Sequence, residues 1–407
     1  MPMKIAVIGA GPAGMAFALA AARGGETVTL YEQKEALGRK LLVTGSGRCN
    51  LSNHAVSAGV YTCPDPSWLA QTLEAMPPEA LLATLDGWGI PSFATPDGWV
   101  YPLSESAGAV VAILEEQLRN AGVILRVATR VKRFERSRGG GGWKLDLDGP
   151  DAPSAACDHL VLASGGRAYP RLGSDGALFP LLRELGHTVR PPLPALGPIY
   201  AELGAFAALK GQRFDARTAI YAGEELLGSS EGNLIVIAEG FNGPGVMNLS
   251  HLVGVHGSQA LSLSLDLLGT RRKRLEQGLM SARCSLGALL SMFFAPKAVP
   301  VLLQMAGLQP HKQVGQLNMR EGMALVKSLS DLRFKVSGAG NFENSQVKVG
   351  GVAVNEVHPV TMRSLKLPEL SLVGEVLDVA GPCGGYNLHF AFASGILAGK
   401  AFAAPGL

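Results

Sequence analysis

Residues 4–32 read KIAVIGAGPAGMAFALAAARGGETVTLYE, and this stretch decides the fold. A β-rich run (4–8) leads directly into GAGPAG (9–14), and an apolar helical stretch follows to about Arg23. A second β-rich run (27–31) then ends at Glu32. The order of strand, glycine turn, helix and strand predicts a βαβ unit, which begins an α/β fold with a parallel sheet.

The glycine spacing in this turn is typical of a dinucleotide site. Gly9 allows a tight turn, Gly11 allows the backbone to approach a pyrophosphate, and Gly14 allows the helix to pack closely on the strand. The helix N-terminus offers N–H groups and partial positive charge to phosphates. Glu32 can accept hydrogen bonds from an adenosine ribose and disfavours a 2′-phosphate, so the pattern predicts a dinucleotide other than NADP at this turn.

The composition limits the class of protein. The chain has 407 residues, of which 47% are hydrophobic and 17% charged, and this predicts two or three folded domains. A formal net charge of +3 permits an anionic ligand without requiring nucleic acid. The five cysteines include no CxxC pair, which argues against a zinc knuckle or a disulfide framework and favours a reduced, cytoplasmic setting. The sequence predicts neither a metal site nor a membrane span.

A second glycine-rich turn lies near the C-terminus. A predicted strand (370–373) runs into GEVLDVAGPCGGYN (374–387), and an apolar helix follows from about Asn387. NAD needs only one such turn, whereas the longer FAD has a ribityl chain and a flavin ring to hold. Asp378 can bind ribityl hydroxyls, and the helix start at Gly385–Asn387 can stabilise negative charge on a reduced flavin. The two turns together therefore indicate FAD.

Five blocks make the sequence resemble the BaiN/YhiN-type NAD(P)/FAD-dependent oxidoreductases from end to end. These blocks are GAGPAG (9–14), GRKLLVTGSGRCNLSN (38–53), ASGGRAYPRLGSDG (163–176), VGGV (349–352) and GEVLDVAGPCGGYN (374–387). The sequence departs from the family pattern at Lys348, where a small or hydroxyl residue is usual, in the run TMRSL (361–365), and at Cys383. The resemblance implies an FAD domain split in sequence, an inserted β-barrel-like domain and a small helical domain.

Composition along the chain agrees with this plan. Further secondary structure is expected as a helix at 106–121 and strands at 123–127, 130–136, 143–147 and 159–163. The proline cluster PPLPALGP (191–198) marks entry into an inserted region, where LIVIAEGF (234–241), VMNLS (246–250) and ALSLSLD (260–266) are β-like. LRFKVSG (332–338) is strand-like, and VKVGGVAV (347–354) leads back to the sheet. We expect an FAD-binding domain at 1–192 and 345–407, a β-rich domain at 193–268 and 330–344, and a helical domain at 269–329.

The loop 38–53 is expected to lie along the cofactor, as the resemblance implies. Arg39, Lys40 and Arg48 bring positive charge to phosphates or to the flavin, and Asn50 can hydrogen-bond the ring edge. The resemblance also assigns backbone contacts with adenine to Val131. The residues predicted to bind FAD are Gly9, Gly11, Ala13, Gly14, Glu32, Arg39, Lys40, Leu41, Gly45, Arg48, Cys49, Asn50, Val131, Ser164, Gly165, Gly166, Gly374, Glu375, Asp378, Gly384, Gly385, Tyr386 and Asn387.

Cys49 and Tyr169 are the candidates for catalysis. Cys49 lies in the loop expected to face the flavin, where a thiol can tune or trap the ring. Tyr169 follows the Gly165–Gly166 turn, where a phenol can give a proton to a reduced carbon. Packing roles remain open for both residues. His187 and His389 are isolated in the sequence, and His389 is expected to be a buried, hydrogen-bonded histidine.

The expected function is that of an FAD-dependent oxidoreductase, fed transiently by NAD(P)H, that reduces an activated C=C bond in a small molecule. Three alternatives stay open: reduction of an RNA pyrimidine to dihydrouridine, oxidation of a small amine, and flavin binding without catalysis. The basic run RRKR (271–274) can contact RNA phosphates, although such runs are usually solvated helix faces.

Overall fold

The computed structural model describes residues 2–137, 141–150 and 153–402. The chain forms two compact units: unit 1 comprises Met1–Leu193 with Gln346–Leu407, and unit 2 comprises Pro194–Ser345. Each unit has its own hydrophobic core. The segment 269–329 shares its core with the strands of unit 2, so a separate helical domain stays a prediction.

Unit 1 is built on a five-stranded sheet in which all neighbouring strands run parallel. In spatial order its strands are β19 (Leu370–Leu372), β10 (His159–Leu162), β1 (Lys4–Ile8), β2 (Thr27–Tyr31) and β6 (Ile124–Arg126). Strand β1 is central, with an almost wholly buried sequence, as expected for a parallel strand covered on both faces. The predicted α/β fold with a Rossmann-like sheet is confirmed.

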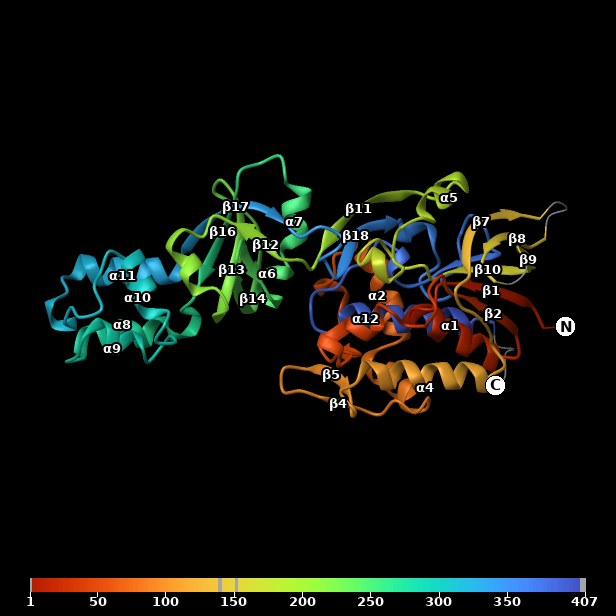
Figure 1. Cartoon of the computed structure of the whole chain (residues 1–407), viewed down its shortest axis with the longest axis horizontal. Helices are drawn as coiled ribbons and strands as arrows, with labels where there is room; N and C mark the ends of the chain where they lie inside the picture. Colours follow the sequence, from red (N-terminus) through yellow and green to blue (C-terminus); the bar gives the residue numbers. More distant parts are fainter. Residues whose placement is uncertain (1, 138–140, 151–152, 403–407) are drawn as a thin grey trace. The chain divides into compact units, whose positions relative to one another are not determined.

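Two helices from opposite ends of the chain pack together in unit 1. Helix α1 (Pro12–Arg23, red) and helix α12 (Tyr386–Lys400, blue) lie side by side (Figure 1). Their backbones approach closely because the contact residues are small: a Cβ added at Gly399 would lie 2.7 Å from both the Ala20 Cβ and the Phe17 carbonyl. This packing brings the N-terminus of α12 to the same part of the unit as the glycine turn before α1.

Smaller elements surround this sheet. They are β3 (Ser52–Asn53), β4 (Ser92–Ala94) and β5 (Trp99–Pro102) in one antiparallel sheet, β7 (Arg130–Arg136), β8 (Trp143–Asp148) and β9 (Ser154–Cys157) in another, and helices α2 (Pro66–Ala75), α3 (Pro78–Asp86), α4 (Ala107–Asn120) and α5 (Phe179–Glu184). Residues 138–140, in the predicted connection between β7 and β8, lie outside the described residues. Strand β18 (Val347–Val352) pairs with β11 (Val189–Ala195) and does not enter the five-stranded sheet.

Unit 2 contains a closed barrel. Its strands, in order around the barrel, are β12 (Ile199–Ala201), β15 (Gly240–Asn242), β14 (Glu225–Ile237), β13 (Arg213–Ala222), β16 (Leu261–Asp266) and β17 (Leu332–Ala339). Its helices are α6 (Pro244–Met247), α7 (Ser250–Val255), α8 (Arg272–Ser281), α9 (Leu286–Leu290), α10 (Val299–Met305) and α11 (Met319–Ser330).

One strand expectation in unit 2 is wrong. The run VMNLS (246–250) was expected to be β-like, but it falls in helix α6 and the start of α7. Gly243 has a φ of 97°, and Pro244 occupies the first helical turn. Because Pro244 has no N–H for a strand ladder and its φ suits a helix start, the hydrophobic run continues as helix.

Among the described residues, no helix has the length and apolar content needed to cross a membrane. The same residues contain no cluster of three or more His, Cys, Asp or Glu side chains placed to hold a metal ion. No disulfide joins the five cysteines, all of which lie in the described part of the chain.

Candidate functional site

The carboxyl edge of the five-stranded sheet collects the glycine-rich segments of unit 1. Strand β19 is followed by Gly374 and Glu375, β10 by residues 163–166, β1 by Gly9, and β2 by Glu32. All of these strands run parallel, so their ends lie along one edge, where open α/β sheets bind ligands. The strand order predicts the direction of a bound dinucleotide: adenosine near β2, pyrophosphate over β1, and the remaining part towards β10 and β19.

The glycine turn after β1 leaves space where a phosphate would approach. Gly9 has a φ of +103°, and a Cβ there would lie 2.5 Å from the Ala163 carbonyl oxygen. A Cβ at Gly14 would overlap the Gly9 carbonyl oxygen. A Cβ at Gly11 would meet nothing within 4 Å. Two of the three glycines are thus required for packing, whereas Gly11 faces open space at the N-terminus of α1.

Glu32 is fixed by backbone donors at the end of β2. Its Oε2 accepts a hydrogen bond from Ala10 N and its Oε1 accepts one from Lys34 N, both at 2.9 Å. Burial raises the pKa of this carboxyl group, and the backbone hydrogen bonds oppose that shift. Thr129 N donates to the Glu32 carbonyl at 2.9 Å, which brings the start of β7 and the buried Val131 to this end of the edge.

The loop 163–176 crosses the edge from β10 to β2. Near its start, a Cβ at Gly166 would lie 2.9 Å from Glu375 Oε1. Near its end, the Gly173 carbonyl accepts a hydrogen bond from Gln33 Nε2 at 2.6 Å, just beyond β2. Between these points Tyr169 has a φ of 58°, a left-handed conformation that is uncommon for an aromatic residue. Such backbone strain concentrates at ligand sites.

The loop 38–53 crosses the same edge in the opposite sense. Gly38 N donates to the Ala10 carbonyl at 2.9 Å, and Lys40 Nζ forms an ion pair with Glu375 Oε2 at 2.5 Å. The loop therefore runs from the glycine turn to the end of β19. Arg39 is exposed, and Leu41 is buried in the core.

The guanidinium of Arg48 contacts two protein side chains, Tyr101 and Glu105. It stacks 4.5 Å from the centre of the Tyr101 ring, and its Nη2 donates to the Tyr101 hydroxyl at 3.2 Å. Its Nη1 lies 3.4 Å from Glu105 Oε2. Gly45 has a φ of 55°, and a Cβ there would lie 3.2 Å from Asn50 N. A direct role of Arg48 at the cofactor stays a prediction.

The N-terminus of α12 is joined to the loop 38–53 and to β3. With its amide oriented to satisfy both ends, Asn50 donates to the Val100 and Ser52 carbonyls and accepts a hydrogen bond from Gly385 N at 3.2 Å. Asn53 Nδ2 donates to the Gly384 carbonyl at 2.9 Å. These bonds hold the positive end of a 15-residue helix near the carboxyl edge of the sheet.

The two polar side chains predicted for this turn, Asn387 and Asp378, both have protein partners. The Asn387 amide bridges the backbone of Gly381, accepting from its N–H and donating to its carbonyl, both at 2.8 Å. Asp378 is buried, and its Oδ2 accepts a hydrogen bond from Arg190 Nη1 at 3.0 Å. Direct contacts of these two residues with FAD stay predictions.

The residues at the edge fit FAD. Of four buried side-chain polar atoms in the described residues that have no hydrogen-bond partner, two lie here: Glu375 Oε1, beside Gly166, and Ser174 Oγ, beside Gly165. A buried oxygen without a hydrogen-bond partner destabilises the folded state, so these two atoms indicate that a ligand supplies the missing hydrogen-bond partners. Together with the open position at Gly11, they suit the hydroxyl-rich, extended shape of this dinucleotide. Ala13 and Gly374 pack on each other here, since a Cβ at Gly374 would lie 2.7 Å from the Ala13 Cβ.

The candidate catalytic groups are in their neutral forms at neutral pH. Burial raises the pKa of Cys49 to about 12, although its side-chain hydrogen bond with Thr44 opposes the shift. Cys49 is fully buried, so a role at the flavin is that of a thiol and not of a thiolate. Burial also raises the pKa values of Tyr169 and Tyr386, which keeps both phenols protonated. The catalytic roles of Cys49 and Tyr169 stay predictions.

His389 is a structural histidine, as expected. Its Nδ1 lies 2.9 Å from Ser52 Oγ and its Nε2 lies 3.2 Å from the Met76 carbonyl. Burial lowers its pKa to about 4, so the ring is neutral.

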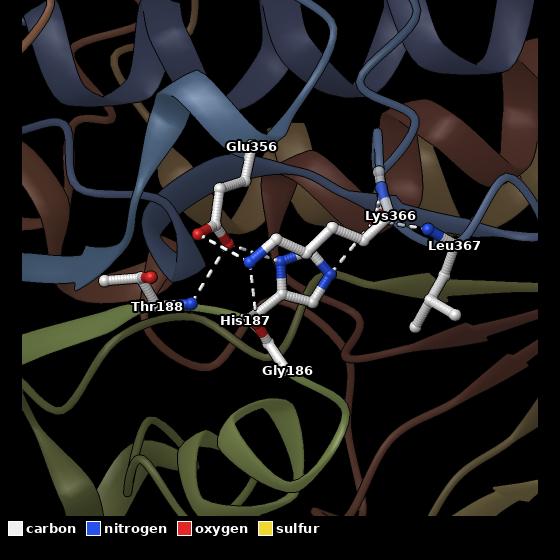
Figure 2. Close-up of polar contacts among 7 residues, drawn as sticks. Gly186, His187, Thr188, Glu356, Lys366 and Leu367 are labelled. Atoms are coloured by element: carbon white, nitrogen blue, oxygen red, sulfur yellow. Dashed lines mark hydrogen bonds and ion pairs between the residues drawn. The ribbon is translucent and has the colours of Figure 1, made fainter.

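The structure brings together a serine, a histidine and a glutamate that are far apart in the sequence. His187 Nδ1 lies 3.0 Å from Glu356 Oε2 (Figure 2). His187 Nε2 lies 3.0 Å from Ser364 Oγ. Lys366 Nζ donates to Glu356 Oε1 at 2.7 Å and to the Gly186 carbonyl. Sequence reasoning found no Ser/His/acid set, because no local spacing connects residues 187, 356 and 364.

This cluster has a structural role, and we call its residues, Ser364, His187, Glu356 and Lys366, the His187 clasp. Ser364 Oγ accepts hydrogen bonds from the backbone N–H groups of Lys366 and Leu367, so its own proton is directed at His187 Nε2. The serine is buried with its acceptor positions filled, which leaves no route for attack on a substrate. Burial acts to raise the pKa of Glu356, but hydrogen bonds from Lys366, Thr188 and His187 outweigh it and lower the pKa to about 2.

Comparison with known proteins identifies the family. A model described as the HI0933-like protein Rossmann domain matches residues 3–401. The chain belongs to the HI0933-like family. The resemblance to BaiN/YhiN-type proteins is thereby confirmed, and this HI0933-like protein is an FAD-dependent oxidoreductase.

Two curated relatives match this HI0933-like protein over nearly its whole length. A 3-dehydro-bile acid delta(4,6)-reductase from Clostridium scindens is 34% identical over 412 residues, which cover 98% of this chain and 99% of the relative. A ribosomal RNA dihydrouridine synthase from Escherichia coli is 29% identical over 394 residues, which cover 95% of each chain.

A solved structure shares the fold of this HI0933-like protein. The 3-ketosteroid delta1-dehydrogenase from Sterolibacterium denitrificans aligns over 99% of both chains with a TM-score of 0.51 and 13% identity.

Proposed function

We propose that this protein uses FAD and NAD(P)H to reduce an activated C=C bond in a small, conjugated carbonyl compound. The observation that carries the proposal is the 34% identity, over nearly the whole of both chains, with a bile acid delta(4,6)-reductase. The names of that relative and of the dihydrouridine synthase both denote saturation of a carbon–carbon double bond. The reaction type is therefore common to both relatives, whereas their substrates differ.

The residues of unit 1 are suited to hold the cofactor for this chemistry. Glu32 anchors the adenosine end, the N-terminus of α1 receives the pyrophosphate, and Glu375 with Ser174 supplies unpaired oxygens near the other end. Bound FAD supplies hydride transfer between a nicotinamide and a substrate carbon. The dipole at the N-terminus of α12 favours negative charge at that end of the edge.

Saturation of the double bond also requires a proton at the second carbon. Tyr169 is our candidate donor, because its phenol is half-buried and held protonated by a raised pKa. Its left-handed backbone fixes the side chain on the loop that crosses the edge. Cys49, as a buried neutral thiol, contributes packing within the loop 38–53.

RNA reduction is the second candidate, and it is favoured by the 29% identity to the dihydrouridine synthase. The basic run 271–274 gives it limited support, because half of the run is engaged within unit 2. Arg271 donates to the Leu267 and Phe293 carbonyls and stacks on Phe294, and Arg272 pairs with Glu276 at 3.0 Å. A small-molecule substrate is therefore our first proposal, with a transient nicotinamide and a cytoplasmic setting, which suits five cysteines that form no disulfide.

Turnover assays separate the two candidates. Purified holoenzyme with NADH or NADPH is given either a 3-oxo-Δ4 steroid or an in vitro transcribed ribosomal RNA, and products are measured by mass spectrometry. We expect the steroid to gain two hydrogen atoms and the RNA uridines to remain unchanged. Dihydrouridine in the RNA with no steroid product would contradict the small-molecule proposal and favour the second candidate.

A further inference from the structure

Lys348 is a lysine with no solvent exposure. It lies on β18, is 0% exposed, and ranks among the largest fully buried side chains of the chain. Lysine is almost never fully buried unless its charge is compensated, because removing an ammonium group from water is costly. The surroundings of this side chain must therefore offset that cost.

Backbone carbonyls surround the Lys348 ammonium. Its Nζ donates to the Gly350 carbonyl and, at 2.6 Å, to the Leu377 carbonyl. Gly350 and Gly351 have φ values of +81° and +114°, and a Cβ at Gly351 would lie 2.6 Å from Nζ. The chain thus folds back over the ammonium at two glycines: a Cβ at Gly351 would displace the ammonium, and a Cβ at Gly350 would overlap the Pro191 carbonyl.

The same lysine lies under the cofactor edge. A Cβ at Gly166 would lie 2.6 Å from Lys348 Cγ, 3.0 Å from Lys348 Cε and 2.9 Å from Glu375 Oε1. Lys348 and the unpaired oxygen of Glu375 therefore both lie next to Gly166, near the start of the loop 163–176. By the strand order, this end of the edge receives the part of FAD beyond the pyrophosphate.

We propose that the buried ammonium of Lys348 tunes the reduction potential of the bound flavin by stabilising the negative charge that the ring gains on reduction. The proposal rests on FAD lying along the carboxyl edge as described above. A fixed charge in a buried, water-poor setting acts over longer distances than one at the surface. Because the glycine-rich backbone holds Nζ in place, the ammonium does not have to move when the flavin is reduced.

The groups that surround Lys348 have opposing effects on its pKa. Burial lowers the pKa of Lys348 to about 8, Glu375 and Asp378 act to raise it, and Lys40 acts to lower it. Arg190 pairs with Asp378. Reduction of the flavin adds negative charge nearby and so raises the pKa of Lys348 above about 8. At a pH above about 8, reduction is therefore accompanied by the uptake of an additional fraction of a proton. The potential of the wild type should therefore fall more steeply with pH above about pH 8.

Spectroelectrochemical titration of the holoenzyme tests the proposal. Lys348→Met removes the charge and keeps a similar shape. We expect the ratio of reduced to oxidised flavin at a fixed potential to fall at least tenfold, a shift of about 30 mV to more negative potential for a two-electron couple. Lys366→Met is the matched control, because the Lys366 ammonium also donates to a backbone carbonyl but belongs to the His187 clasp. Its potential should equal that of the wild type.

A Lys348→Met holoenzyme with the wild-type potential would overturn the proposal. If that variant does not fold or retain FAD, the wild type decides: a potential that falls linearly from pH 6.5 to 9.5, with no change in slope, would overturn it equally. A wild type that binds no FAD would instead overturn the cofactor assignment, and the proposed function with it.

Discussion

Replacing Glu32 with alanine separates its two roles, one in the fold and one in binding. The carboxylate accepts hydrogen bonds from Ala10 N and Lys34 N at 2.9 Å. Hydrogen bonds to charged groups contribute roughly 1.5–3 kcal/mol each, and Ala10 N would lose its acceptor in a buried turn. The cost of burying this carboxylate, which raises its pKa, offsets part of the roughly 3–6 kcal/mol from the two bonds, so we expect the apoprotein to lose about 2–4 kcal/mol of its free energy of unfolding. Lost ribose hydrogen bonds of about 1 kcal/mol each would raise the dissociation constant of FAD by roughly 10- to 100-fold.

Two measurements resolve these effects. Denaturant unfolding of the apoprotein reports the internal hydrogen bonds, and fluorescence titration with FAD reports the ribose contacts. Glu35→Ala, an exposed acid three residues further on, is the control and should change neither quantity. If Glu32→Ala binds FAD as tightly as the wild type, the adenosine does not lie at the end of β2.

Three other predictions concern the opposite end of the edge, the His187 clasp and the proton donor. Asp378→Ala should lower the flavin absorbance per protein while unit 2 stays folded, and unchanged flavin content would disprove our placement of the ribityl chain. The pKa of Glu356 is depressed to about 2, so its stabilising effect is complete above its ordinary pKa of 4.5 and is lost as the pH falls towards 2. The stability gap between the wild type and Glu356→Gln, at most about 3 kcal/mol, should therefore close over that window; a gap independent of pH would contradict the clasp. Tyr169→Phe should slow substrate reduction at least tenfold and leave flavin reduction by nicotinamide unchanged, and equal slowing of both steps would exclude a role as proton donor.

Local patterns in the sequence were sufficient to predict the sheet and its ligand-facing turns. Strands β1 and β2 have the predicted bounds, because each is specified by its own periodicity and by Gly9 or Glu32 at its end. Helix α1 ends at Arg23 as expected but begins at Pro12, within the predicted turn 9–14. The position of Glu375 beside Lys40 and Gly166 could not be derived in the same way. It depends on the packing of α12 against α1, which joins segments more than 350 residues apart.

Other features could not be read from local spacing at all. The Ser364, His187 and Glu356 clasp unites three isolated polar residues, and nothing near any of them in the sequence indicates its partners. Lys348 lies in a strand-like run, where a lysine is ordinarily expected to face solvent. Its burial follows from Gly350, Gly351 and the Leu377 carbonyl, which meet only after the chain has folded. The strand predicted for VMNLS (246–250) was wrong because Pro244 favours a helix start more strongly than the β-like composition favours a strand.

The measurement that tests the central claim most directly is anaerobic stopped-flow absorbance of the bound flavin. The account predicts that NADH or NADPH reduces the flavin, and that a conjugated enone reoxidises it faster than reduction occurs. If neither nicotinamide reduces the flavin while a small amine does, with oxygen as the acceptor, the protein is an oxidase and the proposed reductase function is wrong.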